Sequence, residues 1–437
     1  MKEWRSLPMH AARLGLAGLA ACVALLFVAS RAGSAGAELA DRERPAPTQG
    51  DHLLLAASDL EPLRGVGAHA RGTDARGSWL RFETAAPGAT AAVGTSAPLV
   101  KPLDLTGRFV SLWARVDDAA RLVGAELVLA SREGAFVVPI PVFADGPMNL
   151  LQSGQWVELT LGLGPARREG RPDRAAIERV EWRLAERGDA GPRVRGWVGG
   201  LAAHTLPPEG IVSLSFDDGY DEHFSVAAPV LAEHGLRATA YVMPDQVGQQ
   251  GYMTLEQLHA LQRNFGWDVA AHHFTPLTEF PRDALPGILD GIQRWLAGNG
   301  FDAGRLHLAY PLGKHDAGIL ALVRDRFATA RLASGGSETL PPMDPHRLRA
   351  LNVVDSTPPE TLVTAARRAR EEREWLILMF HFLVDAPQRE TEYAVGRFRE
   401  AIAGIAGAGV AVRPVSEVWG ELRGGGSEPP PNPPARR

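Results

Sequence analysis

Two different hydrophobic patterns divide the chain. Between residues 51 and 205, short apolar runs such as 79–82, 109–113 and 156–160 are separated by turn residues and show no helical period. Runs of this length and spacing predict β-strands, and many such strands in succession indicate an all-β sandwich. We therefore expect residues 51–205 to form a β-sandwich.

From Gly210 onwards, strand-like runs alternate with helical stripes. The apolar runs lie at 211–214, 238–243, 267–271, 306–310, 328–332, 351–354, 375–380 and 410–412. Between them, Thr254 with Gln257 three residues later has the form of a capping box, and a helix at 283–297 is interrupted near its start by Pro286. Repeated β-α units predict a parallel α/β fold over 206–422, with a barrel favoured over an open sheet.

The two ends of the chain have their own composition. Basic residues followed by an uncharged run from Leu14 to Ser30 and then small residues predict a signal peptide or an N-terminal membrane anchor over 1–37. A lipoprotein signal at Cys22 is a third alternative. Each alternative places the body of the protein outside the cytoplasmic membrane, whether secreted, periplasmic or membrane-anchored. Residues 38–50 are expected to be a linker and 423–437 a disordered tail.

The charge of the chain argues against one class of partner, and its cysteine content indicates what stabilises the folded body. The formal net charge is −5, and the densest basic patch, 367–370, is followed at once by two glutamates, which argues against a nucleic-acid partner. Cys22 is the only cysteine of the chain, so the folded body is expected to depend on its packed core and not on disulfides.

Asp and His side chains stand where three predicted strands end. Asp217 and Asp218 follow the first strand of the α/β region, His272 and His273 follow the third, and His381 follows the run 375–380. In a parallel barrel these ends share one face, where active sites lie. Carboxylate oxygens and imidazole nitrogens suit Zn²⁺ or a similar divalent ion, and a second carboxylate could take a proton from a metal-bound water.

These motifs resemble the polysaccharide deacetylases with the NodB homology domain, also called carbohydrate esterase family 4. The run 215–219 (Ser-Phe-Asp-Asp-Gly) matches the first motif of the family, which implies that Asp217 is the general base and Asp218 a metal ligand. His272 matches the first histidine of the second motif. The run 378–381 (Leu-Met-Phe-His) matches the fifth motif, in which Leu378 would line the acetyl pocket and His381 would be the general acid.

The resemblance extends to two further segments and to the fold. Tyr310, Pro311 and Gly313 resemble the third motif and would contribute to the substrate pocket, and 352–356 resembles the segment before the last helix and strand. The family implies a distorted, incomplete (β/α) barrel over roughly 211–422. No part of the chain before residue 211 takes part in the resemblance.

Two positions depart from the family pattern. The second metal histidine is expected four residues after His272, where this chain has Pro276, and His273 is the nearest substitute. The metal ligands would then be Asp218, His272 and His273 in an altered loop, or Asp218 and His272 with a water or an outside ligand. The arginine that usually orients the base is replaced by Ala309.

Five tryptophans fall in the predicted sandwich, at Trp79, Trp113, Trp156, Trp182 and Trp197. They could form a platform for sugar rings, or they could belong to the core. Their positions inside strand-like runs favour the core. The sequence pattern around 154–156 and 172–180 resembles that of the jelly-roll modules attached to carbohydrate enzymes. A carbohydrate-binding role for 51–205 therefore stays open.

Together these features predict metal-dependent hydrolytic deacetylation of an acetylated polysaccharide, with an N-acetylhexosamine glycan as the expected substrate. A non-catalytic carbohydrate-binding protein with a degenerate site is the alternative, motivated by Pro276. Hydrolysis of a glycosidic bond is a third alternative. It needs carboxylates on both sides of the bond, and no second group is placed as well as Asp217 and Asp218.

Overall fold

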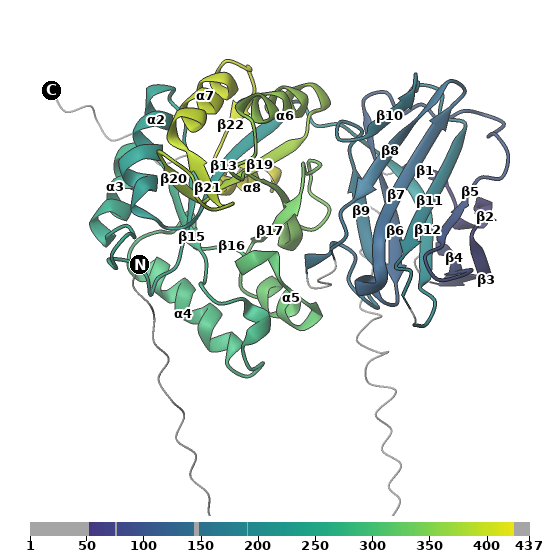
Figure 1. Cartoon of the computed structure of the whole chain (residues 1–437), viewed down its shortest axis with the longest axis horizontal. Coiled ribbons are helices and arrows are strands. Elements are labelled where there is room, and N and C mark those ends of the chain that lie inside the picture. The colour runs from purple at the N-terminus through teal and green to yellow at the C-terminus, as the bar shows by residue number, and fades with distance from the viewer. Residues whose placement is uncertain (1–51, 75–76, 144–147, 190, 424–437) are drawn as a thin grey trace, which may run out of the picture. The chain divides into compact units, whose positions relative to one another are not determined.

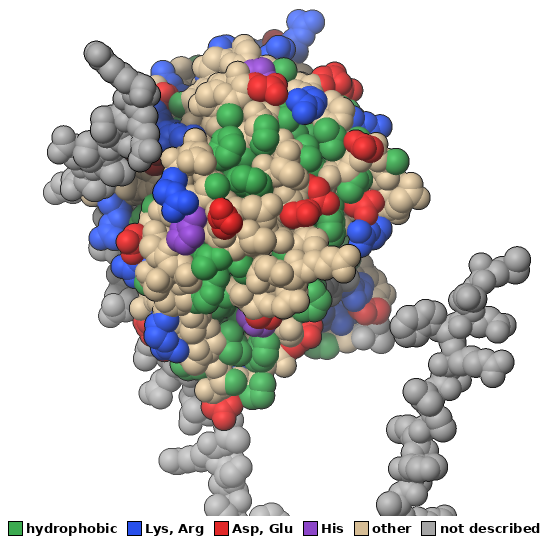
Figure 2. Space-filling model, turned by 90° about the vertical axis from the view of Figure 1, so that its left-hand side faces the viewer, with side chains coloured by type: hydrophobic (Ala, Val, Ile, Leu, Met, Phe, Trp, Pro, Cys, Tyr) green, Lys and Arg blue, Asp and Glu red, His purple; other side chains and the backbone are tan. Residues whose placement is uncertain are grey.

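The computed structural model describes residues 52–74, 77–143, 148–189 and 191–423 (Figure 1). The predicted signal or anchor, the linker and all but the first residue of the predicted tail lie outside these residues. Within the described part of the chain, no helix is both long enough and apolar enough to span a membrane. Acidic, basic and hydrophobic side chains are interspersed on the face drawn in Figure 2.

The N-terminal region consists of two antiparallel six-stranded sheets, as an all-β sandwich requires. One sheet has the order β3-β4-β12-β6-β9 with β1 paired to β12, and the other has the order β10-β8-β7-β11-β5-β2. The strands are β1 (His52–Leu55), β2 (Glu61–Arg64), β3 (Val66–Asp74), β4 (Gly77–Thr84), β5 (Thr90–Gly94), β6 (Arg108–Val116), β7 (Leu122–Ser131), β8 (Gly134–Ile140), β9 (Val157–Leu161), β10 (Arg167–Gly170), β11 (Arg179–Glu186) and β12 (Arg195–Thr205).

The tryptophans of the sandwich divide between its core and an outer face. Trp182 on β11 is 2% exposed and belongs to the core, as predicted. On β4, the side chains that enter the core are Leu80 and Phe82, so the two-residue alternation of a strand sends Trp79 to the opposite face. The expectation of a core position is therefore wrong for Trp79. It is wrong for Trp197 too, which alternates with the core residue Val198.

The C-terminal region is a closed ring of seven parallel strands. The order is β14-β15-β16-β17-β18-β19-β13, and pairing of β13 with β14 closes the ring, while β22 adds to β13 outside it. The strands are β13 (Ile211–Asp218), β14 (Thr239–Val242), β15 (Asp268–Ala271), β16 (His307–Ala309), β17 (Thr329–Gly335), β18 (Leu348–Asn352), β19 (Trp375–Phe380) and β22 (Ala411–Val412), with a small separate pair β20 (Phe382–Val384) and β21 (Glu392–Ala394). The predicted incomplete (β/α) barrel is confirmed, because the ring has seven strands where a complete barrel of this kind has eight.

Helices surround the ring (Figure 1). They are α2 (Ala228–Glu233), α3 (Leu255–Phe265), α4 (Leu285–Gly298), α5 (Ala317–Arg324), α6 (Pro359–Glu372), α7 (Val395–Ala406) and α8 (Val415–Leu422). The predicted capping box of α3 is present, since Thr254 Oγ1 accepts from the Gln257 amide and Gln257 Oε1 accepts from the Thr254 amide. Helix α4 begins later than expected because Pro286, which has no N–H, fits in its first turn.

Candidate active site

The predicted Asp and His residues converge at the carboxyl ends of the ring strands. Asp217 and Asp218 end β13, His272 directly follows β15, and His381 directly follows β19. Asp218 Oδ1 lies 3.3 Å from His272 Nε2. The charge of His381 acts on Asp218, and the charges of both aspartates act on His381. The structure therefore brings four of the predicted site residues together.

Backbone geometry explains how two adjacent aspartates can face one site. Consecutive residues of a regular strand point to opposite faces. Asp218, however, has a φ of +76° and is followed by Gly219 at +84°, so the chain leaves the strand at Asp218. A positive φ costs a non-glycine residue about 1–2 kcal/mol, and such strain concentrates at functional sites.

The Asp218–His272 pair has the chemistry of two metal ligands. The Ala309 carbonyl, 2.8 Å from His272 Nδ1, can only accept, so Nδ1 carries a proton and Nε2 faces Asp218. This second hydrogen bond is typical of histidines that bind metals. A carboxylate and a neutral imidazole nitrogen at 3.3 Å need a proton or a cation between them.

Electrostatics of the pair point the same way. Burial would raise the pKa of the Asp218 carboxyl, but the hydrogen bond and the charge of His272 outweigh it and lower the pKa to about 2. Burial would lower the pKa of His272, but the hydrogen bond to Asp218 and the charges of both aspartates raise it above its usual value. The site thus favours a positive charge next to Asp218.

His273 lies in a different environment from His272. Its Nδ1 accepts from the Thr275 amide at 3.0 Å, and its ring packs edge-on against Phe280. Across the described ranges, no three His, Cys, Asp or Glu side chains are grouped closely enough to hold a metal ion. Asp218 and His272 are suited to be two ligands of a divalent ion. His273, the predicted third ligand, is not grouped with them.

Arg331 is a site residue that the motifs did not identify. It is 1% exposed on β17, and its Nη2 contacts both carboxylate oxygens of Asp217, at 2.6 Å for Oδ2. Its guanidinium lies 5.0 Å from the centre of the Tyr241 ring. The signal in the sequence was a single charge inside the apolar run 328–332, close after the strand in which the expected arginine is Ala309.

Small residues leave the space that Arg331 uses. Ala270 and Ala309 form a separate buried cluster with Tyr241, and Tyr241 is the register partner of Asp217 on the next strand. An arginine side chain can therefore extend past two alanines to the carboxylate. Buried charges are stable only when paired in this way.

His381 is the candidate acid of the site. Burial lowers its pKa, against the opposing effect of Asp217 and Asp218. The carbonyl oxygen of His381 accepts from His223 Nε2 at 2.9 Å, which fixes the backbone at the end of β19. Its Nδ1 is buried and has no hydrogen-bond partner within the described part of the chain.

Leu378 lies elsewhere than predicted for a residue of the acetyl pocket. It is fully buried and belongs, with Leu376 and Phe380, to the main hydrophobic core. Met379, one residue later, contacts Arg331 through its Sδ. Because side chains alternate along a strand, Met379 and not Leu378 shares the face of β19 that His381 continues.

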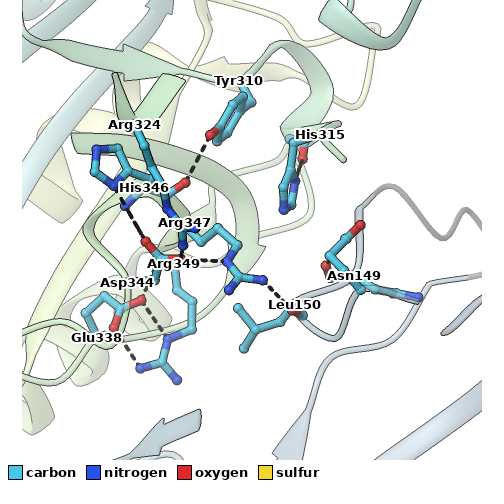
Figure 3. A network of polar contacts seen from close by, with 12 residues as sticks. Asn149, Leu150, Tyr310, His315, Arg324, Glu338, Asp344, His346, Arg347 and Arg349 are labelled. Carbon is cyan, nitrogen blue, oxygen red and sulfur yellow. Dashed lines mark hydrogen bonds and ion pairs between the residues drawn. The ribbon is translucent and has the colours of Figure 1, made fainter. Parts of the chain in front are cut away.

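The third motif forms a supported loop after β16. Tyr310 is 2% exposed, donates its hydroxyl to the His346 carbonyl at 3.1 Å and stacks on His315 (Figure 3). Leu312, at a φ of +56°, is the exposed tip, whereas Pro311 and Gly313 are buried. The structure thus gives Tyr310 a supporting position, and substrate contact by this loop stays a prediction.

A buried ion network lies beneath this loop (Figure 3). Asp344 Oδ2 accepts from Arg347 Nε at 3.0 Å and from Arg324 Nη2 at 2.6 Å. Its Oδ1 accepts from the His346 amide at 2.9 Å. Burial would raise the pKa of Asp344, but Arg347, His346 and Arg324 hold it well below its usual value. The network fixes the segment that carries the acceptor for Tyr310.

Comparisons with known proteins cover both regions of the chain. The model of a family described as "Polysaccharide deacetylase" matches residues 205–326. A "Putative polysaccharide deacetylase YxkH" from Bacillus subtilis (strain 168) is 26% identical over 119 residues, which are 26% of this chain and 42% of the relative. The match thus spans less than half of that relative.

Two solved structures show more distant similarity. A family 4 carbohydrate esterase from Streptomyces lividans, in complex with acetate, is 21% identical with a TM-score of 0.31, and the match covers 46% of this chain and 87% of the esterase. The family 11 carbohydrate-binding module of the cellulase Lic26A-Cel5E from Clostridium thermocellum is 11% identical with a TM-score of 0.27, over 36% of this chain and 95% of the module.

Proposed function

We propose that this chain, which belongs through residues 205–326 to the polysaccharide deacetylase family, hydrolyses acetyl groups from an acetylated polysaccharide. One observation carries the proposal. Asp217, held by Arg331, lies beside the Asp218–His272 pair, and His381 interacts electrostatically with all of them. A base, a cation site and an acid in one cluster are what hydrolysis of an amide or ester requires.

Asp217 is the general base of the proposed reaction. Arg331 contacts both of its oxygens through one nitrogen, which holds the carboxylate in place and leaves lone pairs that can accept a proton from the attacking water. Fixing a reacting group in this way lowers the entropic part of the barrier. Arg331 therefore acts on the reaction through Asp217.

Asp218 and His272 would hold a divalent ion, with zinc as the expected metal. When bound, such an ion supplies Lewis-acid activation of water and of the acetyl carbonyl. Two protein ligands leave more of the coordination sphere to water or substrate than the three expected. His381 would protonate the leaving amine or alcohol, and its lowered pKa makes it a ready proton donor once charged.

The proposed substrate is a glycan that contains N-acetylhexosamine, outside the cytoplasmic membrane. The N-terminal pattern of basic, apolar and small residues supports this location. The ligand set supports the second candidate, a carbohydrate-binding protein without catalysis, because the described residues contain no group of three potential metal ligands.

Acetate release from purified, metal-loaded protein separates the two candidates. Suitable substrates are fragments of chitin, peptidoglycan, poly-N-acetylglucosamine and acetyl-xylan. We expect release with the wild-type protein and none with Asp217→Asn, whereas Asp245→Asn, which changes an exposed carboxylate, serves as the control with unchanged release. No release from any of these substrates by the wild-type protein would contradict the proposal.

A further inference from the structure

Tyr220 lies in the turn after β13, two residues beyond Asp218. Its hydroxyl forms a hydrogen bond with the Asp218 carboxylate. We propose that Tyr220 is a positioning residue, which holds Asp218 in the orientation that binds the divalent ion. The proposal rests on the cation site at Asp218 and His272 in the proposed function, and it is independent of which acetylated glycan is hydrolysed.

The direction of this hydrogen bond follows from the chemistry of its partners. A carboxylate can only accept, so the Tyr220 hydroxyl donates its proton to Asp218. Burial, and then the negative charge of Asp218, raises the pKa of Tyr220, so the hydroxyl keeps this proton. The terminal torsion of an aspartate side chain is otherwise broad. Contacts with both Tyr220 and His272, whose Nε2 lies 3.3 Å from Asp218 Oδ1, therefore limit the rotation of the carboxylate.

Backbone contacts fix the turn that carries Tyr220. Tyr220 and Tyr252 form an isolated β-bridge between this turn and the segment before α3. Beside the bridge, the Met253 amide donates to the Gly219 carbonyl at 2.9 Å. The hydroxyls of the two tyrosines are also hydrogen-bonded to each other. The place of the Tyr220 hydroxyl is therefore set by the fold as well as by Asp218.

The Tyr220 ring belongs to a stack of aromatic side chains. Its centre lies 3.6 Å from that of Phe382 and 5.2 Å from that of Tyr252, and both pairs are stacked. The Arg389 guanidinium lies 4.7 Å from the centre of the Phe382 ring. Because Phe382 directly follows His381, the stack joins the turn after β13 to the strand end that carries the proposed acid. The ring of Tyr220 is thus used in packing, and its hydroxyl is the part that acts on the site.

Both predicted ligands that lie together then have a supporting hydrogen bond. His272 is oriented by the bond between its Nδ1 and the Ala309 carbonyl at 2.8 Å. Tyr220 gives Asp218 the corresponding support. Partners of this kind fix the orientation of a ligand, and their loss typically weakens metal binding about 10–100-fold. A site that depends on two protein ligands should be sensitive to the loss of either support.

The zinc affinity of the full chain, measured by competition with a chelator, tests this role without any substrate. Tyr220→Phe keeps the ring and its stacking but removes the hydroxyl. We expect this variant to weaken zinc binding about tenfold or more. Tyr393→Phe is the matched control, because the hydroxyl of Tyr393 is hydrogen-bonded to the Thr357 carbonyl at 3.1 Å, and its zinc affinity should equal that of the wild type.

A second variant tests the stack. Phe382→Leu keeps the Tyr220 hydroxyl but removes the ring that lies 3.6 Å from it, and it should weaken zinc binding less than Tyr220→Phe does. This variant keeps the test informative should Tyr220→Phe not fold. Urea denaturation of the metal-free proteins is measured in parallel, because a purely structural role would lower stability without changing the zinc affinity of the folded protein.

Three results would overturn the positioning role of Tyr220. They are wild-type zinc affinity in Tyr220→Phe, no zinc binding by the wild-type protein, and a phenolate absorption band on addition of zinc, which would make Tyr220 a direct ligand. Acetate release is measured separately. Weaker zinc binding by Tyr220→Phe together with no acetate release by the wild type would refute the deacetylase proposal and support the role of Tyr220.

Discussion

Arg331 on β17 is the register partner of Ala309 on β16. The resemblance to the deacetylase family places the base-orienting arginine at position 309, where this chain has alanine. The guanidinium instead reaches Asp217 from the paired position on the next strand. Directly paired residues of neighbouring strands share a face of the sheet. An arginine at position 309 or at position 331 therefore places its charge in the same region inside the ring.

Removal of Arg331 is expected to lower both activity and stability. Arg331→Ala leaves the buried Asp217 carboxylate without its partner, which costs about 3–5 kcal/mol of unfolding free energy. Loss of the contact that holds the carboxylate in place should reduce kcat for acetate release by about 100-fold or more. Urea denaturation and steady-state kinetics measure the two effects. A folded Arg331→Ala protein with wild-type kcat would show that Arg331 does not position the base.

A double variant separates position from side-chain type. Ala309→Arg combined with Arg331→Ala restores a guanidinium at the place that the family uses. We expect it to recover part of the kcat lost in Arg331→Ala, because the paired positions face the same space. Arg331→Lys keeps the charge but has one nitrogen where arginine uses Nη2 for Asp217 and Nη1 for the Leu332 carbonyl, and it should recover less than the double variant.

Metal content should depend on His272 far more than on His273. His272 presents Nε2 to Asp218, whereas His273 uses Nδ1 within its own loop. We expect His272→Ala to lower the bound metal at least about tenfold, as loss of a ligand does, and His273→Ala to lower it little. Mass spectrometry of dialysed protein gives the stoichiometry. Equal losses in both variants would instead support the three-ligand site with an altered loop.

The raised pKa of Asp268 leads us to expect a change of stability in mildly acidic solution. This carboxylate accepts from the backbone and hydroxyl of Ser416 at the start of α8, yet burial raises its pKa to about 6 from 3.8. A raised pKa in the folded state means that stability is gained as the pH falls through 6 and is complete below the unfolded pKa. The gain corresponds to about 2–3 kcal/mol.

The variant Asp268→Asn cannot gain a proton and should lack this increment. Its unfolding free energy, measured by urea denaturation relative to wild type, should therefore fall by about 2–3 kcal/mol between pH 7.5 and pH 4. Using the difference between the two proteins removes the contribution of other titrating groups. A difference that stays constant with pH would mean that Asp268 is not protonated in this range.

The lowered pKa of Asp344 leads us to expect the opposite dependence of stability on pH. Its pKa is held well below 3.8, so its contribution is present above the unfolded pKa and is lost as the pH falls below it. Asp344→Asn removes the charge between Arg324 and Arg347 and should cost about 3–5 kcal/mol at pH 7. Asp325→Asn, which changes an exposed carboxylate nearby, should cost less than about 0.5 kcal/mol.

Regular patterns made the fold predictable from sequence. The β-α repeat after residue 210 predicted the barrel, and the strand-end positions of Asp217, Asp218, His272 and His381 predicted their convergence. Both inferences use the spacing of apolar residues along the chain, which can be read from neighbouring residues without knowledge of strand pairing. Gly219 marks in the sequence the turn at which both Asp218 and Gly219 have a positive φ.

The missed features depend on strand phase and strand pairing. Whether Leu378 or Met379 faces the site depends on which of two adjacent residues points inward, and an apolar run gives no sign of this phase. The same ambiguity led to a core assignment for Trp79. Arg331 reaches Asp217 from a strand 114 residues further along the chain, so its role required the register of β16 and β17.

The pairing of β16 with β17 has a consequence for how relatives of this protein are recognised. A search that scores the orienting arginine by its place along the chain counts this protein as damaged at position 309. A search that scores the charge by its place inside the ring counts it as intact. Two paired strands thus offer two sequence positions from which an arginine can reach the same carboxylate. Sequences that lack the motif arginine should therefore be checked for an arginine on the next strand before they are classed as inactive.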